Sequence, residues 1–299
     1  MQSRIYSSYA EARKGLLEET FSINRMQSRI YSSYAELKNC NNLNIIEMKK
    51  VVILLAAALC AAVQNASAWG RVGHEAIAAI AENHLTERAK ANIEKYLDGR
   101  SIVYYAAWMD QQHDHKPYKH TVTVDKDNEP LSPKKRPELD GMNAISLSLE
   151  RLQDYKNQPK DTVAQDIKFI VHLIGDIHCP AHIVYPKVTR FFPVTIMGRV
   201  KKYHPVWDGM LDYNHGWGYN EWREQLDRYS EEEIAAMAEG TPMSWARENA
   251  QRCRVIYEWA KKDDVLDRKF INQAYPLAED LVVKASYRLA KLLNELFDE

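Results

Sequence analysis

The sequence has 299 residues, of which 45% are hydrophobic, and its 40 Lys and Arg residues nearly balance its 41 Asp and Glu residues. A chain of this length forms one or two domains. Its net charge of −1 provides no overall basic field, so attraction of the whole protein to nucleic acid by net charge is excluded.

Residues 48–68 have the features of a signal peptide. Met48-Lys-Lys begins a short positive region, residues 51–63 form an apolar core, and Ala66-Ser67-Ala68 is a small-residue cleavage site. The apolar core is too short to span a bilayer as a transmembrane helix. Cleavage after Ala68 would make Trp69 the N-terminus, and we expect a secreted or periplasmic protein without a stable membrane anchor.

Residues 1–47 precede this signal peptide and contain a direct repeat, because Met1–Glu11 recurs at Met26–Glu36. We interpret Met48 as the true start of the protein. Residues 1–47 are then an over-extended or disordered leader, and a genuine cytoplasmic tail is the alternative.

The mature chain is then 69–299. It holds 32 Lys and Arg against 36 Asp and Glu, a net charge of −4, together with all ten histidines. Its two cysteines are Cys179 and Cys253. They could pair in an oxidising compartment, although one potential pair is weak evidence for a disulfide.

Helical spacing of apolar residues begins near the predicted mature N-terminus. The pattern predicts a long helix from His74 to Leu97, ended by Asp98-Gly99, and a second helix that Ser101 caps and that runs to Asp110. A short alternation predicts an extended piece at 120–124. Residues 125–138 are polar and proline-rich, and we expect a loop there.

Further amphipathic patterns predict a helix through Met142–Leu152 and another that ends near Cys179. Another helix should begin at His204-Pro205, because proline suits the first helical turn. Ser230 and Glu233 have the spacing of a capping box. Helices are also expected at about 230–239, 243–261 and 270–297. Because no repeat, linker or sustained set of strands occurs, we predict a single all-α domain.

The stretch from His172 to His182 is the densest group of metal-ligand residue types. His172 and Asp176 are four residues apart and share one helix face. Pro180 should end that helix, so that His182 returns from the following turn. Imidazole and carboxylate groups form zinc sites. The alternative is a buried polar helix end whose histidines bond to the backbone.

Other candidate ligands recur along the chain. His204 and Asp208 are a second i, i+4 pair, Asp110 ends a predicted helix, and His120 begins the extended piece. After cleavage, the α-amine and carbonyl of Trp69 could chelate a metal, and His74 lies five residues further on. Each candidate alone is weak evidence, but nine in one helical domain indicate a metal centre.

These motifs resemble the S1/P1 nuclease family of zinc-dependent enzymes, which is related to bacterial phospholipase C. The resemblance spans most of the mature chain and implies a mostly helical domain of the phospholipase C/P1 nuclease type. The matching pieces are Trp69-Gly-x-x-Gly-His74, Trp108-Met-Asp110, His120, His172-x-x-x-Asp176-x-His178-x-Pro-x-His182 and His204-x-x-Trp-Asp208.

The resemblance implies three zinc ions per chain. The first zinc would be bound by Asp110, His120, His172 and Asp176. The second would be bound by His182, His204 and Asp208, and the third by Trp69, His74 and the bridging Asp176. His178 would be structural or would support a ligand, since it points away from the face of Asp176.

The activity implied is hydrolysis of single-stranded DNA and RNA to 5′-phosphorylated products, and 3′-nucleotidase activity is compatible with it. Asp110 and Asp176 are the implied catalytic residues, with Asp110 able to orient the attacking water. Paired zinc ions would lower the pKa of a bound water. The expected partner is single-stranded nucleic acid or a nucleotide, and we expect a monomer.

The sequence departs from the family pattern at the substrate-binding positions. His113 replaces a frequent arginine, Thr121 replaces an aromatic residue, and Thr123 replaces a base-binding aspartate. A basic, aromatic segment at 183–203 replaces a Gly-Gly-Asn segment. We therefore predict substrate contacts at His113 and Thr121, and in the segment at Tyr185, Phe191, Phe192, Lys201 and Lys202. A solvated surface segment is the alternative.

Two other functions are compatible with the sequence. The same metal centre could serve a phospholipase C-like enzyme, and the apolar stretch Phe191–Met197 would then touch lipid. A zinc-binding protein without catalysis would be expected to lack a ligand, but all nine are present.

Overall fold

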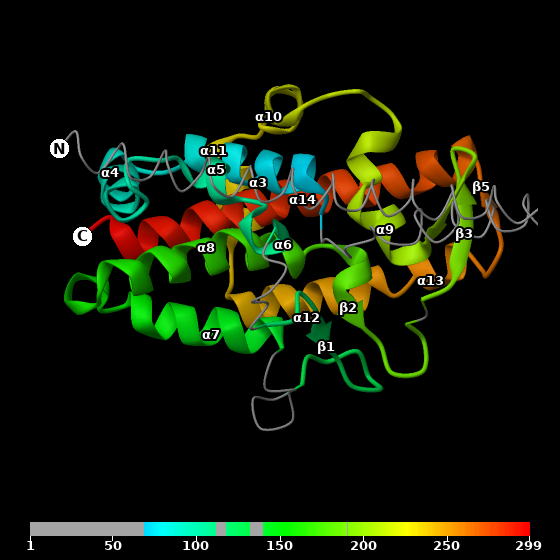
Figure 1. Cartoon of the computed structure of the whole chain (residues 1–299), viewed down its shortest axis with the longest axis horizontal. Coiled ribbons are helices and arrows are strands. Elements are labelled where there is room, and N and C mark those ends of the chain that lie inside the picture. Colours follow the sequence, from blue (N-terminus) through cyan, green and yellow to red (C-terminus); the bar gives the residue numbers. More distant parts are fainter. Residues whose placement is uncertain (1–68, 112–117, 132–139, 190) are drawn as a thin grey trace, which may run out of the picture. The chain divides into compact units, whose positions relative to one another are not determined.

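The computed structural model describes residues 69–111, 118–131, 140–189 and 191–299. The leader and the predicted signal peptide lie outside these residues. The α-helices are α3 (Arg71–Asn83), α4 (Glu87–Tyr96), α5 (Ile102–Tyr105), α6 (Trp108–Gln111), α7 (Gly141–Leu152), α8 (Lys160–Asp176), α9 (Tyr203–Asp208), α10 (Tyr219–Leu226), α11 (Glu231–Ala238), α12 (Pro242–Cys253), α13 (Ile256–Trp259) and α14 (Arg268–Phe297) (Figure 1). The strands are β1 (Val122–Thr123), β2 (Ile183–Val184), β3 (Pro193–Ile196), β4 (Arg199–Lys202) and β5 (Val265–Leu266).

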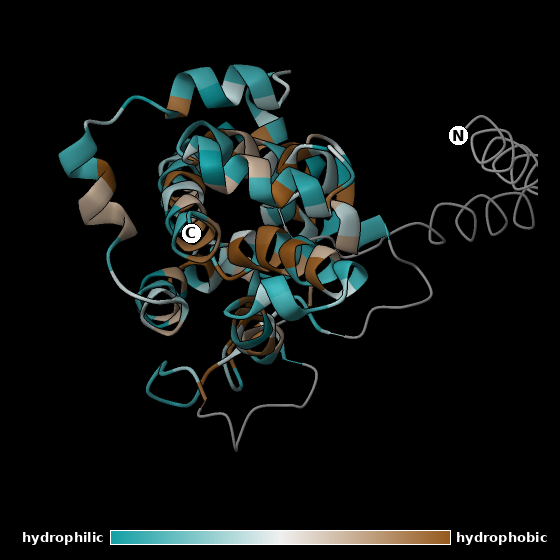
Figure 2. Cartoon of the chain, turned by 90° about the vertical axis from the view of Figure 1, so that its left-hand side faces the viewer, coloured by the Kyte–Doolittle hydropathy of each residue, from teal (hydrophilic) through white to brown (hydrophobic). Residues whose placement is uncertain are grey.

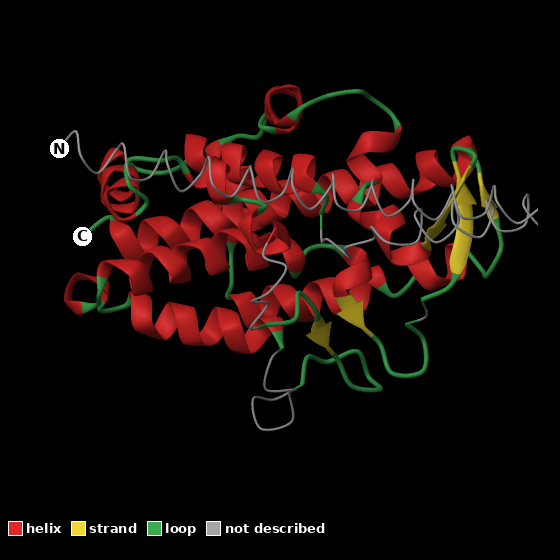
Figure 3. Ribbon diagram, viewed as in Figure 1, coloured by secondary structure: helices red, strands yellow, loops and turns green. Residues whose placement is uncertain are grey.

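The described part of the chain is mostly helical, as predicted, and its strands are short (Figure 3). β1 and β2 form a parallel pair. β3 pairs with β4 in an antiparallel hairpin and with β5 in parallel. The segment 183–203, predicted to be non-helical, therefore supplies three of the strands. Within the described residues, every helix is too short or too polar to span a lipid bilayer.

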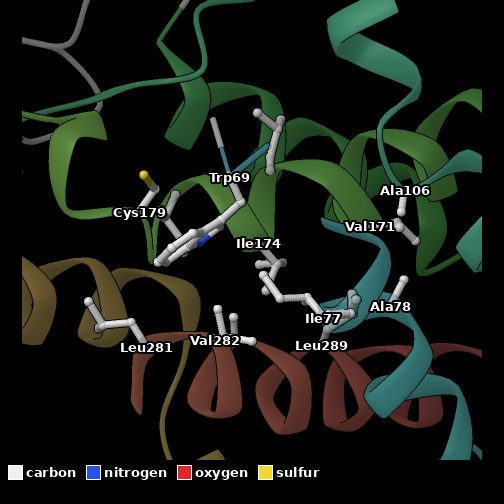
Figure 4. Close-up of a cluster of buried hydrophobic side chains, with 14 of the residues drawn as sticks. Trp69, Ile77, Ala78, Ala106, Val171, Ile174, Cys179, Leu281, Val282 and Leu289 are labelled. Carbon is white, nitrogen blue, oxygen red and sulfur yellow. The ribbon is translucent and has the colours of Figure 1, made fainter. Parts of the chain in front are cut away.

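Helix α14 packs against α3 and α8, and these three helices form the centre of the core. Each contributes apolar side chains to one buried cluster, including Ile77 from α3, Ile174 from α8 and Leu289 from α14 (Figure 4). The apolar residues of the central helices face inward and the polar residues lie mainly outside (Figure 2). α7 covers another side of α8.

The predicted long helix from His74 to Leu97 is wrong in one respect, because it is two helices. α3 ends at Asn83 and α4 begins at Glu87. Between them, Thr86 accepts a hydrogen bond from the Ala89 N–H at 3.1 Å through its side-chain oxygen. This N-cap starts a new helix in a new direction, and the apolar spacing alone did not reveal it.

The predicted helix from Ser101 to Asp110 is likewise divided into α5 and α6, although Ser101 caps it as predicted. The helix predicted at 243–261 is divided into α12 and α13. The capping box at Ser230 and Glu233 is confirmed at the start of α11.

Candidate metal centre

Three separate pieces of the chain bring His120, His172, Asp110 and Asp176 together. His172 and Asp176 lie on the C-terminal half of α8, Asp110 lies in α6, and His120 precedes β1. Their facing atoms are His120 Nδ1, His172 Nε2, Asp110 Oδ1 and Asp176 Oδ2, and five pairs among these four lie 3.1–3.7 Å apart. Ligands at about 2.0–2.1 Å in a tetrahedron around zinc are separated by about 3.3 Å. The spacing of this group therefore fits one zinc-sized ion.

Hydrogen bonds to backbone carbonyls fix which ring nitrogen of His172 and of His182 faces the neighbouring ligand residues. His172 Nδ1 donates to the Ala106 carbonyl at 2.7 Å, and His182 Nδ1 donates to the His120 carbonyl at 2.6 Å. A carbonyl only accepts, so Nδ1 carries the proton in each neutral ring. The Nε2 lone pair of each ring is then free to bind a metal, as in sites where a second hydrogen bond orients the ligand.

The small parallel pair of β1 and β2 positions two of these histidines. Val122 pairs with Ile183, and His120 and His182 lie just before these two residues. The backbone before β1 is also held by α7, because Gly141 N–H donates to the Thr121 carbonyl. A Cβ at Gly141 would lie 3.0 Å from the Lys119 carbonyl oxygen, so glycine permits this close approach.

Asp176 faces two groups of ligands. Its Oδ2 lies 3.1 Å from His120 Nδ1, whereas its Oδ1 lies 3.3 Å from His74 Nε2. The His74 ring stacks on the His172 ring with centroids 3.9 Å apart. A Cβ at Gly175 would lie 2.9 Å from His74 Nδ1, so the glycine before Asp176 leaves room for this ring. Asp176 therefore presents one carboxylate oxygen to His120 and the other to His74.

A second group consists of His182, His204 and Asp208. His182 Nε2 lies 2.9 Å from His204 Nε2, and each of these nitrogens lies 3.6 Å from Asp208 Oδ1. Helix α9 presents His204 and Asp208 on one face, as the sequence spacing predicted. Cys179 also belongs here, because its Sγ lies 3.7 Å from Asp208 Oδ1.

Trp69 and Gly70 are bound to the end of α9. The Gly70 N–H donates to the Asp208 carbonyl at 2.5 Å, and the Trp69 side chain is fully buried in the core (Figure 4). A Cβ at Gly73 would lie 2.8 Å from Trp69 Cβ, so the second glycine of Trp69-Gly-x-x-Gly-His74 leaves room for the Trp69 side chain. This placement brings Trp69 into the same part of the molecule as Asp208 and His74.

Burial sets the charge state of the ligand groups. It lowers the pKa of His204 to about 4, with His120 as a further cause. The pKa values of His74 and His182 are also lowered, first by burial and then by neighbouring histidines. Burial, with the charges of Asp176 and Asp110, raises the pKa of Asp208. Burial thus leaves the imidazoles neutral, the form that binds a metal, and a bound cation would stabilise the charged form of the Asp208 carboxylate.

The residues present fit a metal. Both ring nitrogens of His74, His204 Nδ1 and Asp208 Oδ2 are buried and have no hydrogen-bond partner among the described residues. Three sets of metal-ligand residue types have mutually close ligand atoms: His74, Asp110 and His172; His120, His172 and Asp176; and Cys179, His182 and Asp208. A divalent cation would satisfy such atoms, whereas an apolar interior would not.

The S1/P1 Nuclease family matches residues 69–298 of this chain. The chain belongs to the S1/P1 nuclease family. Nuclease S1 of Aspergillus oryzae is 26% identical over 278 residues, covering 80% of this chain and 96% of that relative. Endonuclease 2 of Arabidopsis thaliana is 25% identical over 285 residues, covering 83% of this chain and 97% of the relative.

Nuclease PA3 of a Penicillium species is 24% identical over 264 residues, covering 76% of this chain and 97% of the relative. Together, the family and its members identify the chain as an S1/P1-type endonuclease, a hydrolase that acts on nucleic acid. The family is metal-dependent, and the His and Asp clusters of this S1/P1 nuclease are suited to bind metal.

His178 points away from the metal centre of this S1/P1 nuclease. Its Nδ1 donates to the Ile174 carbonyl at 2.7 Å, and its Nε2 accepts from Arg288 Nη1 at 2.9 Å. Arg288 also donates to Glu248 and, at 3.0 Å, to the Met237 carbonyl. His178 is thus one member of a buried network that holds the end of α8 against α12 and α14. Arg288 was not predicted as part of this network, because an arginine within a helix gives no signal of burial.

The predicted substrate residues differ in how exposed their side chains are and in which protein groups they contact. Phe191 is 66% exposed, and its ring centroid lies 6.0 Å from that of His204, so it stands at the rim of the second ligand group. Phe192 is partly buried and stacks on Tyr203 at 5.0 Å. Lys202 is exposed, whereas Lys201 Nζ is 3.2 Å from the Tyr213 hydroxyl.

The prediction that Tyr185 contacts the substrate is wrong. Its side chain is buried, and its hydroxyl donates to the Ala250 carbonyl at 2.7 Å, so it cannot stack on a base without leaving the core.

Thr121 follows His120 directly and is partly exposed. His113 lies outside the described residues. Cys179 and Cys253 are both buried free thiols.

Proposed function

We propose that this S1/P1 nuclease is a zinc-dependent phosphodiesterase that cleaves single-stranded DNA and RNA and leaves 5′-phosphorylated products. The proposal allows 3′-nucleotidase activity on nucleotides. The observation that carries it is the first ligand group, in which His120, His172, Asp110 and Asp176 have the separations expected around one zinc ion.

Three zinc ions would be held by nine residues of the chain. When bound, zinc lowers the pKa of water and neutralises negative charge on a phosphodiester. The first group would take one ion and the second group another, with Asp176 bridging to a third ion near His74 and the N-terminus of Trp69. The residues are Asp110, His120, His172 and Asp176; His182, His204 and Asp208; and Trp69 and His74.

Asp110 and Asp176 are the residues that we assign to catalysis. Asp176 is fully buried, whereas the Asp110 side chain is 9% exposed at the edge of the same group. Asp110 Oδ1 lies 3.5 Å from His120 Nδ1, and its Oδ2 lies 3.9 Å from His74 Nε2. We assign Asp176 to positioning of the ligand groups, and Asp110 to orienting the attacking water from the exposed side.

Substrate binding is assigned to the rim. Phe191 is exposed beside His204 and can stack on a base, an interaction of about 1–3 kcal/mol per base. Lys202 is exposed at the end of β4 and can contact a phosphate. Protein contacts hold Phe192 and Lys201, so each would have to leave its contact to bind substrate. Substrate contacts at Thr121 and His113 stay predictions.

Export and processing form part of the same proposal. Ligation by the α-amine of Trp69 requires that the bond between Ala68 and Trp69 be cleaved. A signal peptide at 48–68 would achieve this in the secretory pathway, and the enzyme would act as a secreted or periplasmic monomer.

The deciding experiment compares substrates with purified, zinc-loaded enzyme. We expect cleavage of single-stranded DNA and RNA, 5′-phosphate on the new ends, and three zinc ions per chain by elemental analysis. Phosphatidylcholine vesicles should not be hydrolysed, since the family match favours a nuclease over the phospholipase alternative. Absence of nuclease activity in protein that retains its zinc would refute the proposal.

A further inference from the structure

A row of aromatic side chains lies beside the metal centre on α5 and α6. We define the aromatic row as Tyr104, Tyr105 and Trp108. Tyr104 is 63% exposed and meets Tyr105 edge-on, with ring centroids 4.9 Å apart. The guanidinium of Arg100 lies 4.3 Å from the Tyr104 ring centroid. An exposed aromatic ring next to a cation is the pairing that single-stranded nucleic acid binds by stacking and charge.

Lys168 of α8 extends this pattern. Its Nζ lies 4.2 Å from the Tyr105 ring centroid and 5.3 Å from that of Trp108. No ion pair of Lys168 is found among the described residues, whereas the neighbouring Asp98 is paired with Lys160 at 2.5 Å. Burial lowers the pKa of Lys168, and the charges of Asp98 and Asp161 oppose this only in part. A half-buried ammonium without a carboxylate partner would gain from a phosphate oxygen.

The row borders a pocket of about 280 Å³ between α4, α5, α6 and α8. Tyr96, Tyr105 and Trp108 supply aromatic walls. Asp98 and Asp161 also line the pocket, but Asp98 is paired with Lys160, so Lys168 is the cation of the described lining that is left for a phosphate. Pockets for small ligands usually begin at about 300 Å³. The size therefore suits one nucleotide unit of a polymer rather than a larger free ligand.

The pocket lies next to the metal ligands in the chain. Trp108 is two residues before Asp110, and Lys168 is four residues before His172 on α8. One helical turn advances about 5.4 Å, so Lys168 is roughly one nucleotide away from a proposed ligand along the helix. Tyr105 precedes Ala106, whose carbonyl holds His172 Nδ1. A strand cleaved at the metal centre could therefore continue into the pocket.

We propose that the aromatic row and the pocket form a second strand-binding subsite, in which bases stack on Tyr104 and Tyr105 and Lys168 contacts a backbone phosphate. The substrate class rests on the proposed function, but the subsite is a separate surface from the rim at Phe191. It gives the enzyme a preference for single strands of several nucleotides over dinucleotides.

The test uses Lys168→Met and Tyr104→Ala, with Lys156→Met as the matched control. Lys156 also lies over a tyrosine ring, 5.7 Å from the centroid of Tyr155, but it does not line the pocket. Binding of a labelled thymidine oligonucleotide of about ten residues is followed by fluorescence anisotropy, and KM is measured for this oligonucleotide and for a dinucleotide. Zinc content and thermal unfolding establish that each variant is intact.

We expect Tyr104→Ala to weaken binding of the longer strand about fivefold or more. Lys168→Met should reduce the slope of log Kd against log salt by about 0.7, the value for one phosphate contact on a single strand. Dinucleotide KM should be unchanged in both variants, and Lys156→Met should behave as wild type.

Equal effects on dinucleotide and longer strand, or no effect on either, would overturn the subsite. If the wild-type enzyme cleaves no oligonucleotide but its binding of the longer strand still depends on Lys168 and Tyr104, the proposed function fails while the subsite is supported. The two failures are therefore distinguishable.

Discussion

The ligand groups around Asp176 and the neighbouring segment 183–203 differ in how their side chains are held. His172 and Asp176 are fully buried, and ring stacking on His74 and a hydrogen bond to the Ala106 carbonyl fix the orientation of the His172 ring. Phe191 is 66% exposed, and the contact that places it is one ring neighbour, His204. Chemistry that needs several atoms within a few tenths of an ångström is thus built in the interior, whereas the rim is free to vary.

The largest effect in this comparison is expected for Asp176→Ala. The variant removes the carboxylate whose two oxygens face His120 and His74. We expect loss of at least one zinc ion more than in His204→Ala, which removes a ligand of the second group alone. Nuclease activity should fall by roughly three orders of magnitude or more, because both ligand groups around Asp176 lose a donor. Elemental analysis and steady-state kinetics measure both quantities, and a full complement of zinc in Asp176→Ala would contradict the bridging assignment.

An unprocessed N-terminus should have the next largest effect. A protein that begins Met-Ala-Ser-Ala before Trp69 has an amide in place of the α-amine, so it lacks one donor of the third site. We expect one zinc fewer and loss of most turnover, while the first and second ligand groups remain filled. The matched control carries the same four residues followed by a protease site that restores Trp69 as the terminus. Equal zinc content before and after that cleavage would be incompatible with ligation by Trp69.

The buried half of the comparison was largely predictable from the sequence. His172 and Asp176, and likewise His204 and Asp208, are spaced one helical turn apart, so helical geometry alone places each pair on one face. His172 and Asp176 lie close to Asp110 and His120, and His204 and Asp208 lie 3.6 Å apart beside His182, so each pair faces other residues of a ligand type. The helix breaks after Asn83 and between α5 and α6 were not predicted, because an N-cap such as Thr86 competes with an apolar pattern that continues through it.

The rim was less predictable for a physical reason. Tyr185 and Phe191 are both aromatic residues in the same basic segment, yet one is buried and the other exposed. Burial of Tyr185 depends on Ala250, a partner 65 residues away that accepts its hydroxyl. Arg288 was missed in the same way, since its partners His178, Glu248 and Met237 come from other elements. The spacing of residues along the sequence does not predict such long-range partners.

Arg288→Met tests whether the interior depends on support behind the ligands. Arg288 is buried, and its removal leaves His178 Nε2 without its donor and leaves Glu248 paired with Lys284 alone among the described residues, which should cost about 1–3 kcal/mol in the free energy of unfolding. Chemical denaturation measures this loss. Lys284→Met is the control, because it removes a different cation from Glu248 and leaves Arg288 in place.

The ion pair between Arg288 and Glu248 predicts a pH dependence of stability. Burial raises the pKa of Glu248, but the hydrogen bonds that Glu248 accepts from Lys284 and Arg288 outweigh burial and lower this pKa from 4.5 to about 2. The folded-state pKa is below the unfolded value, so the stabilisation is present above about pH 4.5 and is lost as the pH falls towards 2. Arg288→Met should lose less stability than wild type across this window. An identical decline in both proteins would show that the pair contributes nothing to it.

Phe191→Ala and Phe192→Ala compare two adjacent aromatic residues of the rim. Phe191 is exposed, whereas Phe192 stacks on Tyr203 and serves the fold. We expect Phe191→Ala to weaken the binding of single-stranded oligonucleotides by about 1–3 kcal/mol, which raises KM, while thermal unfolding and zinc content stay unchanged. Phe192→Ala should lower stability instead. A small phosphodiester such as bis-p-nitrophenyl phosphate has no base to stack, so its KM should not respond to Phe191→Ala.

The smallest effect is expected for Lys202→Met. Lys202 is exposed on β4, and Met keeps the length of the side chain while removing its charge. One lost phosphate contact should flatten the slope of log KM against log salt by about 0.7 for a single-stranded oligonucleotide, with zinc content unchanged. Lys126→Met is the control, because Lys126 is also exposed and pairs only with the adjacent Asp127 among the described residues. If both variants shift the slope equally, the change reflects net charge, and Lys202 makes no specific contact. A shift confined to Lys202→Met would place a backbone phosphate on the β3–β4 hairpin, beside the second ligand group.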